Sequence, residues 1–95
     1  MSKEKELRIF DFGSYREFLR AASELGGRGF FQEMAKELNV HSSLVSQIVR
    51  GSKDPTPEQT CSIAEWLKLT SDETEYLLML VMRERAGNPA LRKFA

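Results

Sequence analysis

Hydrophobic residues recur at helical spacing along five stretches of this chain, and turn-forming residues separate the stretches. They cover residues 15–25, 30–38, 42–50, 57–69 and 71–86. Apolar side chains that return every three or four positions mark one face of an α-helix, whereas a half-buried strand alternates apolar and polar residues. Such alternation is absent from this sequence. The pattern therefore predicts an all-α domain, a compact bundle of about five short helices.

Glycine, proline and threonine stand where the predicted helices begin and end. Glycines at 26–27 follow the first helix, Gly51 follows the third, and a Gly-Asn-Pro run at 87–89 follows the fifth. Pro57 opens the fourth helix directly behind Thr56, a residue type that caps helix N-termini. These signals give the helices their expected boundaries.

The second and third helices have the residues that a tight helical corner requires. Two helices that cross steeply need a small residue at their contact, and Ala35 supplies it. The chain must then reverse within three or four residues through a left-handed backbone conformation, which Asn adopts more readily than other non-glycine residues, so we expect it at Asn39. Val40 fills the corner, and Val45 and Ile48 repeat on the inner face of the third helix.

The opposite face of the third helix is polar. Steps of 100° per residue place Leu44, Val45 and Ile48 on one side of the helix. The other side carries Ser42, Ser43, Ser46, Gln47 and Arg50. No acidic residue occurs between positions 40 and 53. Serines taken alone indicate a solvated face, but a glutamine can bond an adenine edge in the major groove, so the face also suits DNA.

The block from residue 31 to residue 51 resembles the phage-repressor-like (Xre-type) helix-turn-helix. That family places Ala, Gly or Asn, Val, Val or Ile, Ser, Ile and a closing Gly at the spacings found here. The resemblance implies a lambda-repressor-like bundle with its helix-turn-helix at 30–51. Helix 42–50 would then enter the major groove of double-stranded DNA, and helix 30–38 would lie across the backbone.

Site residues follow from this interpretation. The expected base-contacting residues are Ser42, Ser43, Ser46 and Gln47. The expected phosphate-contacting residues are Arg28, Lys36, His41, Arg50 and Lys53. His41 can alternatively act as the N-cap of the third helix. The sequence departs from the family pattern at Phe31, where a phosphate-holding Gln is usual, and at Leu44, where a polar residue is usual. These two side chains can reach thymine methyl groups or each other.

The N-terminal flank resembles a second group of proteins. Phe10, Asp11 and Phe12, followed by Tyr15-Arg16 and Phe18-Leu19, look like the opening of a group of longer predicted bacterial transcription regulators. In that group the module lies at the N-terminus, which implies that a C-terminal sensing region is absent from this chain. The antitoxin of a toxin pair, also a DNA-binding protein, is an alternative if the 95 residues are a complete protein.

A chain of 95 residues fits one domain, and its ends have separate expected roles. Residues 1–9 are expected to be disordered, and residues 70–95 to form a dimerisation helix and tail. Residues 76–82 are apolar all round, although a surface helix needs only one apolar stripe. The expected homodimer interface is Tyr76, Leu77, Leu78, Leu80 and Val81. The alternative cover for these residues is the tail at 90–95, with Leu91 and Phe94.

The charge distribution leaves two classes of partner open. The net charge is zero, but residues 1–53 sum to +2, residues 54–75 to −5 and residues 76–95 to +3. A segregated distribution allows one basic face to meet DNA phosphates. The zero total favours the alternative, a helical protein-docking module (an anti-repressor or regulator subunit) that uses the same corner for protein contacts. The acid-free stretch at 40–53 favours sequence-specific DNA binding by a transcription regulator.

The residue inventory argues against enzymes and bound metals. One histidine cannot complete a nucleophile, base and orienting group, and the glycine-rich run at 26–29 has neither the spacing nor the preceding strand of a phosphate loop. The single cysteine, Cys61, cannot form a disulfide within the chain, and together with the single His41 it provides too few ligands for a zinc site. No cofactor is therefore expected. Cys61 shares an apolar stripe with Ala64 and Leu67, which predicts that it is buried.

Compartment signals point to the cytoplasm. The N-terminus is charged and leads into no apolar signal core. The longest apolar run, at 76–82, has seven residues, whereas a membrane helix needs about 20. We therefore expect a cytoplasmic protein without a membrane partner.

Overall fold

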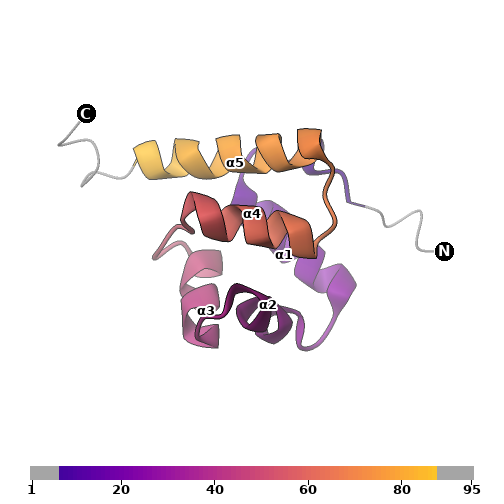
Figure 1. Ribbon diagram of the computed structural model, residues 1–95, viewed down its shortest axis with the longest axis vertical. Coiled ribbons are helices and arrows are strands. Elements are labelled where there is room, and N and C mark those ends of the chain that lie inside the picture. Colours follow the sequence, from indigo (N-terminus) through magenta and orange to yellow (C-terminus); the bar gives the residue numbers. More distant parts are fainter. Residues whose placement is uncertain (1–6, 88–95) are drawn as a thin grey trace.

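The computed structural model describes residues 7–87, and this part of the chain is helical without a β-strand (Figure 1). A short 3-10 helix, η2 (Ile9–Asp11), precedes α1 (Tyr15–Gly26). The remaining helices are α2 (Phe30–Leu38), α3 (Ser42–Arg50), α4 (Pro57–Trp66) and α5 (Ser71–Ala86). The prediction of an all-α bundle of about five short helices is confirmed. The tail at 90–95 lies outside the described residues.

Side-chain caps fix the first turns of three helices. Ser14 accepts a hydrogen bond from the backbone N–H of Arg16 at 3.2 Å and starts α1. Thr56 and Thr70 each form a reciprocal capping box, with Gln59 and Glu73 respectively. A capping box satisfies two backbone donors that the first helical turn leaves free. The chain is therefore directed into α1, α4 and α5 at defined residues.

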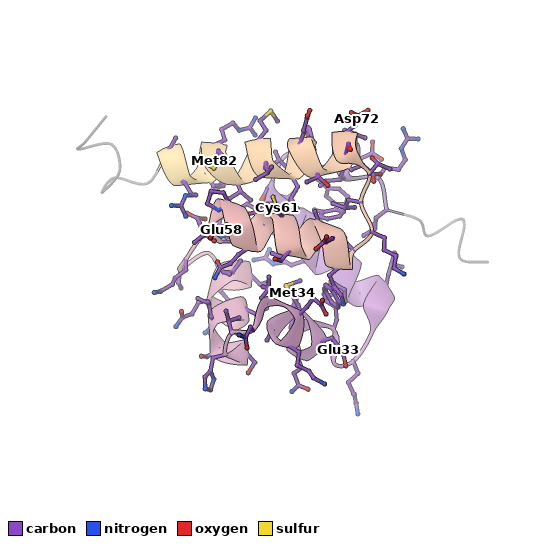
Figure 2. The ribbon with its side chains drawn as sticks, viewed as in Figure 1. Glu33, Met34, Glu58, Cys61, Asp72 and Met82 are labelled. Atoms are coloured by element: carbon purple, nitrogen blue, oxygen red, sulfur yellow. The ribbon has the colours of Figure 1, made fainter. Side chains whose placement is uncertain are left out.

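The helices form two groups around a shared core. α4 and α5 lie side by side and run in opposite directions, while α2 and α3 lie across the other side of α4, and α1 passes behind (Figure 1). Met34 points from α2 toward α4 (Figure 2). Every α-helix contributes fully buried side chains, among them Tyr15, Leu19, Met34, Val45, Ile48, Ile63, Leu77 and Leu80. The second and third helices are thus attached to the bundle through their apolar faces.

The fourth helix is shorter than the sequence predicts and rotated from its predicted face. It ends at Trp66 instead of residue 69, and the chain turns through Lys68, whose φ is +61°. Thr60 is fully buried, and its hydroxyl donates to the Thr56 carbonyl at 2.8 Å. That bond allows a polar residue to take the inner position. Cys61 is consequently exposed, and the prediction that it is buried is wrong (Figure 2).

The segment before α1 is ordered from residue 7. Ile9 is 1% exposed, and half-buried Leu7 packs against the core. The expectation of disorder for residues 1–9 is therefore wrong for residues 7–9, because an apolar side chain anchors them to α5 through η2. Residues 1–6 lie outside the described part of the chain.

The predicted dimer interface on α5 also needs correction. Leu77, Leu80 and Val81 are each no more than 2% exposed, because the domain's own core covers them. Tyr76 is half-buried and donates its hydroxyl to the Phe12 carbonyl at 2.6 Å. The prediction is wrong for the three core residues, because they cannot meet a second copy. Tail residues Leu91 and Phe94, the alternative cover, lie outside the described residues.

The large apolar side chains that α5 does expose are Met79 and Met82, at 46% and 45%. Met82 is labelled at the surface of α5 in Figure 2.

None of the helices between residues 7 and 87 combines the length and hydrophobicity that crossing a membrane requires.

Candidate functional site

The connection between α2 and α3 is a three-residue turn through a left-handed residue. Asn39 has φ 58° and ψ 46°, and the N–H of Val40 donates to the Ala35 carbonyl at 3.0 Å. Ala35 is 4% exposed, so a larger side chain there would meet neighbouring core atoms. The predictions of a left-handed Asn39 and a buried small residue at Ala35 are confirmed.

Helix α3 separates its apolar and polar residues as the sequence predicts. Val45, Ile48 and Val49 are buried, whereas Leu44 is half-buried and packs against the core. The exposed residues of α3 are Ser42, Ser43, Ser46 and Arg50. Gln47 is half-buried. The outward surface of α3 therefore consists of short hydroxyl side chains, part of one amide and one guanidinium, without an acidic group.

All five cationic or titratable residues that the sequence nominates for phosphate contacts are exposed. They are Arg28, Lys36, His41, Arg50 and Lys53. Lys36 lies in the last turn of α2 and His41 at the N-cap of α3, so both are at the α2–α3 turn, whereas Arg50 and Lys53 lie at the C-terminal end of α3. His41 does occupy the N-cap position of α3, but its side chain makes no capping hydrogen bond there.

Arg28 lies apart from the others, beside a hollow at the start of α2. Arg28, Phe31 and Gln32 line this hollow together with Ser23 and the residues around Gly29. Gly29 is the N-cap of α2 in a left-handed conformation, and no side chain caps the helix. No side chain therefore accepts a hydrogen bond from the backbone N–H groups in the first turn of α2. Phe31 instead packs edge-on against the Phe30 ring, with centroids 5.4 Å apart. Gln32 was not among the predicted site residues, although it adjoins the position where the family pattern has glutamine.

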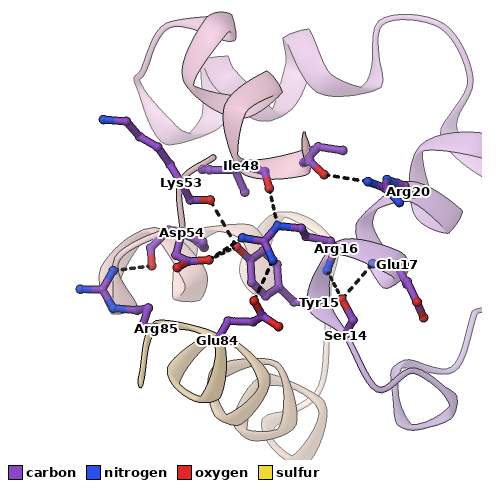
Figure 3. A network of polar contacts seen from close by, with 12 residues as sticks. Ser14, Tyr15, Arg16, Glu17, Arg20, Ile48, Lys53, Asp54, Glu84 and Arg85 are labelled. Atoms are coloured by element: carbon purple, nitrogen blue, oxygen red, sulfur yellow. Dashed lines mark hydrogen bonds and ion pairs between the residues drawn. The ribbon is translucent and has the colours of Figure 1, made fainter. Parts of the chain in front are cut away.

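A polar network holds the C-terminal end of α3, and no local sequence pattern predicted it. The Arg16 guanidinium, on α1, donates from Nε to the Ile48 carbonyl at 3.1 Å (Figure 3). Its two terminal nitrogens pair with Asp54 at 2.7 Å and with Glu84 at 2.8 Å. The same guanidinium lies 4.8 Å from the centroid of the Tyr15 ring. One side chain therefore joins α1, α3, the loop after α3, and α5.

Other donors complete the end of α3. Arg20, one turn after Arg16 on α1, donates to the Val49 carbonyl at 3.2 Å. The Gln47 carbonyl accepts from the N–H groups of Gly51, Ser52 and Lys53, at 3.0, 2.9 and 3.3 Å. The last carbonyls of a helix lack partners within the helix. Here three of them have partners, so α3 is held at its C-terminal turn. The four-residue spacing of Arg16 and Arg20 is the only sequence signal of this arrangement.

Burial and the Asp54 carboxylate change the acid–base behaviour of the network. The Tyr15 hydroxyl donates to Asp54 Oδ1 at 2.5 Å (Figure 3). Burial first, and then this hydrogen bond, raise the pKa of Tyr15 far above its ordinary value. Burial acts to lower the pKa of Arg16, but the hydrogen bond that Arg16 donates to Glu84 and the nearby negative charges outweigh it and raise that pKa. Tyr15 is therefore neutral and Arg16 charged at physiological pH.

No cluster of three or more metal-ligating side chains forms among residues 7–87. In comparisons with known proteins, no family model, curated protein or solved structure matches the chain.

Proposed function

We propose that this chain is a bacterial transcription regulator, or the DNA-binding domain of one, that binds double-stranded DNA sequence-specifically. In this proposal α2 and α3 act as a helix-turn-helix, α3 enters the major groove, and α2 lies across the DNA backbone. The observation that carries the proposal is the outward face of α3, which is exposed, polar and free of acidic residues. Short serine side chains there let the helix backbone approach the base edges closely.

Base reading is assigned to Ser42, Ser43, Ser46 and Gln47. The Gln47 amide offers a donor and an acceptor, which match N6 and N7 of adenine. Gln47 is half-buried, so its side chain is restricted before DNA arrives, and ordering it on binding costs less entropy than ordering a free side chain. The serines supply single hydrogen bonds to several base edges.

Phosphate contacts are assigned to Arg28, Lys36, His41, Arg50 and Lys53. Lys36 and His41 lie at the α2–α3 turn, and Arg50 and Lys53 lie at the C-terminal end of α3, so cations at both ends of α3 would attract the DNA backbone and set the position of the protein. Arg28 would act from the hollow at the start of α2, where free N–H groups and the positive end of the helix dipole favour an anion. Gln32 lines the same hollow and supplies an amide in place of the usual glutamine, whose position Phe31 occupies.

A homodimer is part of the proposal, with a revised interface. One recognition helix reads only a few base pairs, so proteins of this type commonly bind two half-sites about one helical turn apart. Met79 and Met82 are exposed on α5, and half-buried Leu78 lies on the same helix. We assign the contact between copies to these three residues, replacing the core residues that the sequence analysis nominated. The cytoplasm, where DNA is located in bacteria, is the proposed compartment.

The direct test places an acidic group on α3. Ser46→Glu should reduce the affinity for a fluorescent mixed-sequence duplex at low salt by about tenfold or more, because the new carboxylate faces phosphates. The control is Ser71→Glu, at another exposed helical serine, at the start of α5, which changes the net charge by the same amount. It should weaken binding only slightly, through the lower net charge, because its carboxylate lies on α5 and not on the recognition helix.

Anisotropy titrations at several salt concentrations measure both variants. Equal binding by the two variants would contradict the assignment of α3 to DNA. A parent protein that binds no duplex would contradict the function itself and favour the protein-docking alternative.

A further inference from the structure

The Arg16 side chain reaches more elements than a helix cap requires. Its Nε atom satisfies the Ile48 carbonyl, while its terminal nitrogens contact Asp54 and Glu84 (Figure 3). Glu84 lies in the last turn of α5, and its side chain remains 43% exposed. The C-terminal turns of α3 and α5 are therefore tied to the same guanidinium.

We propose that Arg16 and Glu84 are positioning residues through which the C-terminal end of α5 sets the orientation of the last turn of α3. The inference deepens the proposed function, on which its DNA-binding part rests. Arg16 has a planar guanidinium with donors in fixed directions, so a displacement of Glu84 turns the whole fork. The Nε bond to Ile48 then passes the displacement to α3, next to Gln47 and Arg50.

The structure offers no equivalent tie at the start of α3. His41 caps that end without a side-chain hydrogen bond, and the turn before it depends on backbone bonds within the corner. Arg20 adds a second bond from α1 to the Val49 carbonyl, but the described contacts give it no partner on α5. Arg85 on α5 donates to the Pro55 carbonyl at 3.1 Å, in the loop after α3 and not in α3 itself. Glu84 is therefore the residue of α5 whose contact with Arg16 distinguishes a link between α5 and α3 from simple capping by α1.

Amide hydrogen exchange in the free protein tests the link without DNA. Glu84→Ala should speed the exchange of the Gly51 and Ser52 amides about two- to fivefold, the range expected for the loss of a partly exposed ion pair. Both amides donate to the Gln47 carbonyl, so they report on the last turn of α3. The Leu44 amide, which donates to the His41 carbonyl at the start of α3, should keep its rate.

The matched control is Glu65→Ala, which removes an exposed acid from α4. It should leave the Gly51 and Ser52 exchange rates unchanged. Equal rates in Glu84→Ala and the parent protein, or the same acceleration in both variants, would overturn the proposed link. Arg16→Lys keeps the charge but lacks the planar guanidinium with its several fixed donors. It should therefore accelerate exchange at the two amides at least as much as Glu84→Ala does.

DNA titrations add a second readout with a distinctive sign. Both glutamate variants raise the net charge by one, which alone strengthens DNA binding. Glu84→Ala should nevertheless bind a duplex about two- to fivefold more weakly than Glu65→Ala, because its recognition helix is less well oriented. Equal affinities for the two variants would overturn the positioning role. If the parent protein binds no DNA while the exchange rates respond as described, the proposed function fails and the link between α5 and α3 stands.

Discussion

Asn39 and Lys68 illustrate how single residues determine where the helices turn. Both have positive φ values, 58° and 61°, a region that side chains with a Cβ atom populate at a cost. Asn39 joins α2 to α3, whereas Lys68 is exposed, follows α4 and is not one of the proposed DNA-contacting residues. Asparagine is well suited to this conformation and lysine is not. Comparing the two positions therefore distinguishes the effect of a positive φ on stability from any effect on DNA binding.

Substitutions at the two positions should change stability according to how well the new residue adopts a positive φ. Asn39→Val should destabilise the domain by about 1–3 kcal/mol, because a β-branched residue resists a left-handed backbone. Asn39→Gly should be neutral or mildly stabilising, and Lys68→Gly should stabilise by up to about 1 kcal/mol by removing the Cβ clash. Thermal unfolding followed by circular dichroism measures all three. A lower melting temperature for Asn39→Gly than for Asn39→Val would contradict the assigned turn.

At the scale of elements, the sequence predicted those features that depend on neighbouring residues. The α2–α3 turn, the polar face of α3 and the five helices follow from helical spacing and from the conformational preference of Asn39. The choice between Thr60 and Cys61 as the buried residue of α4 depends on a side-chain bond to the Thr56 carbonyl, which apolar patterning does not detect.

Features that join distant segments were not predictable in the same way. Arg16, Asp54 and Glu84 are far apart in the sequence, and no local pattern brings them together. The burial of Leu77 and Leu80 depends on which elements cover α5, including η2, which was expected to lie partly in a disordered segment. Periodicity identified α5 as unusually apolar but could not say which of its faces the domain itself covers.

The Tyr15 hydroxyl of α1 donates to Asp54 in the loop after α3, and this buried contact makes the stability of the fold depend on pH in the alkaline range. Below about pH 10, the ordinary tyrosine pKa, both the folded and the unfolded chain keep the Tyr15 proton, and its contribution to stability is complete. Above that pH the unfolded chain ionises while the folded chain, whose Tyr15 pKa is raised, does not. The free energy of unfolding must then fall as pH increases toward the raised pKa.

Ultraviolet absorbance can follow this titration. The chain has two tyrosines, so a Tyr76→Phe background leaves Tyr15 as the only source of tyrosinate absorbance. We expect that absorbance to increase only when circular dichroism reports loss of helix. Tyrosinate formation near pH 10 in a protein that is still fully helical would contradict the buried hydrogen bond to Asp54.

At the scale of the whole molecule, local arrangement matters more than net charge. The chain is neutral overall, but no acid interrupts residues 40–53, and four of the proposed phosphate-contacting residues lie in the last turn of α2 or at the two ends of α3. The acidic residues of segment 54–75 belong mainly to α4 and α5, and α5 lies on the far side of α4 from α2 and α3 (Figure 1). A neutral domain can therefore present one surface that suits DNA. In the proposed homodimer, the exposed methionines on α5 would form the contact with the second copy.

Selection of bound sequences from a random pool of duplex DNA tests the central claim most directly. The proposal predicts enrichment of one short motif, arranged as two symmetric half-sites about one helical turn apart if the domain binds as a dimer. Selection repeated with Gln47→Ala should relax the preference at one base position in each half-site, at a cost of about 1–3 kcal/mol in affinity for the parent motif. A pool that remains random after repeated selection would contradict sequence-specific DNA binding.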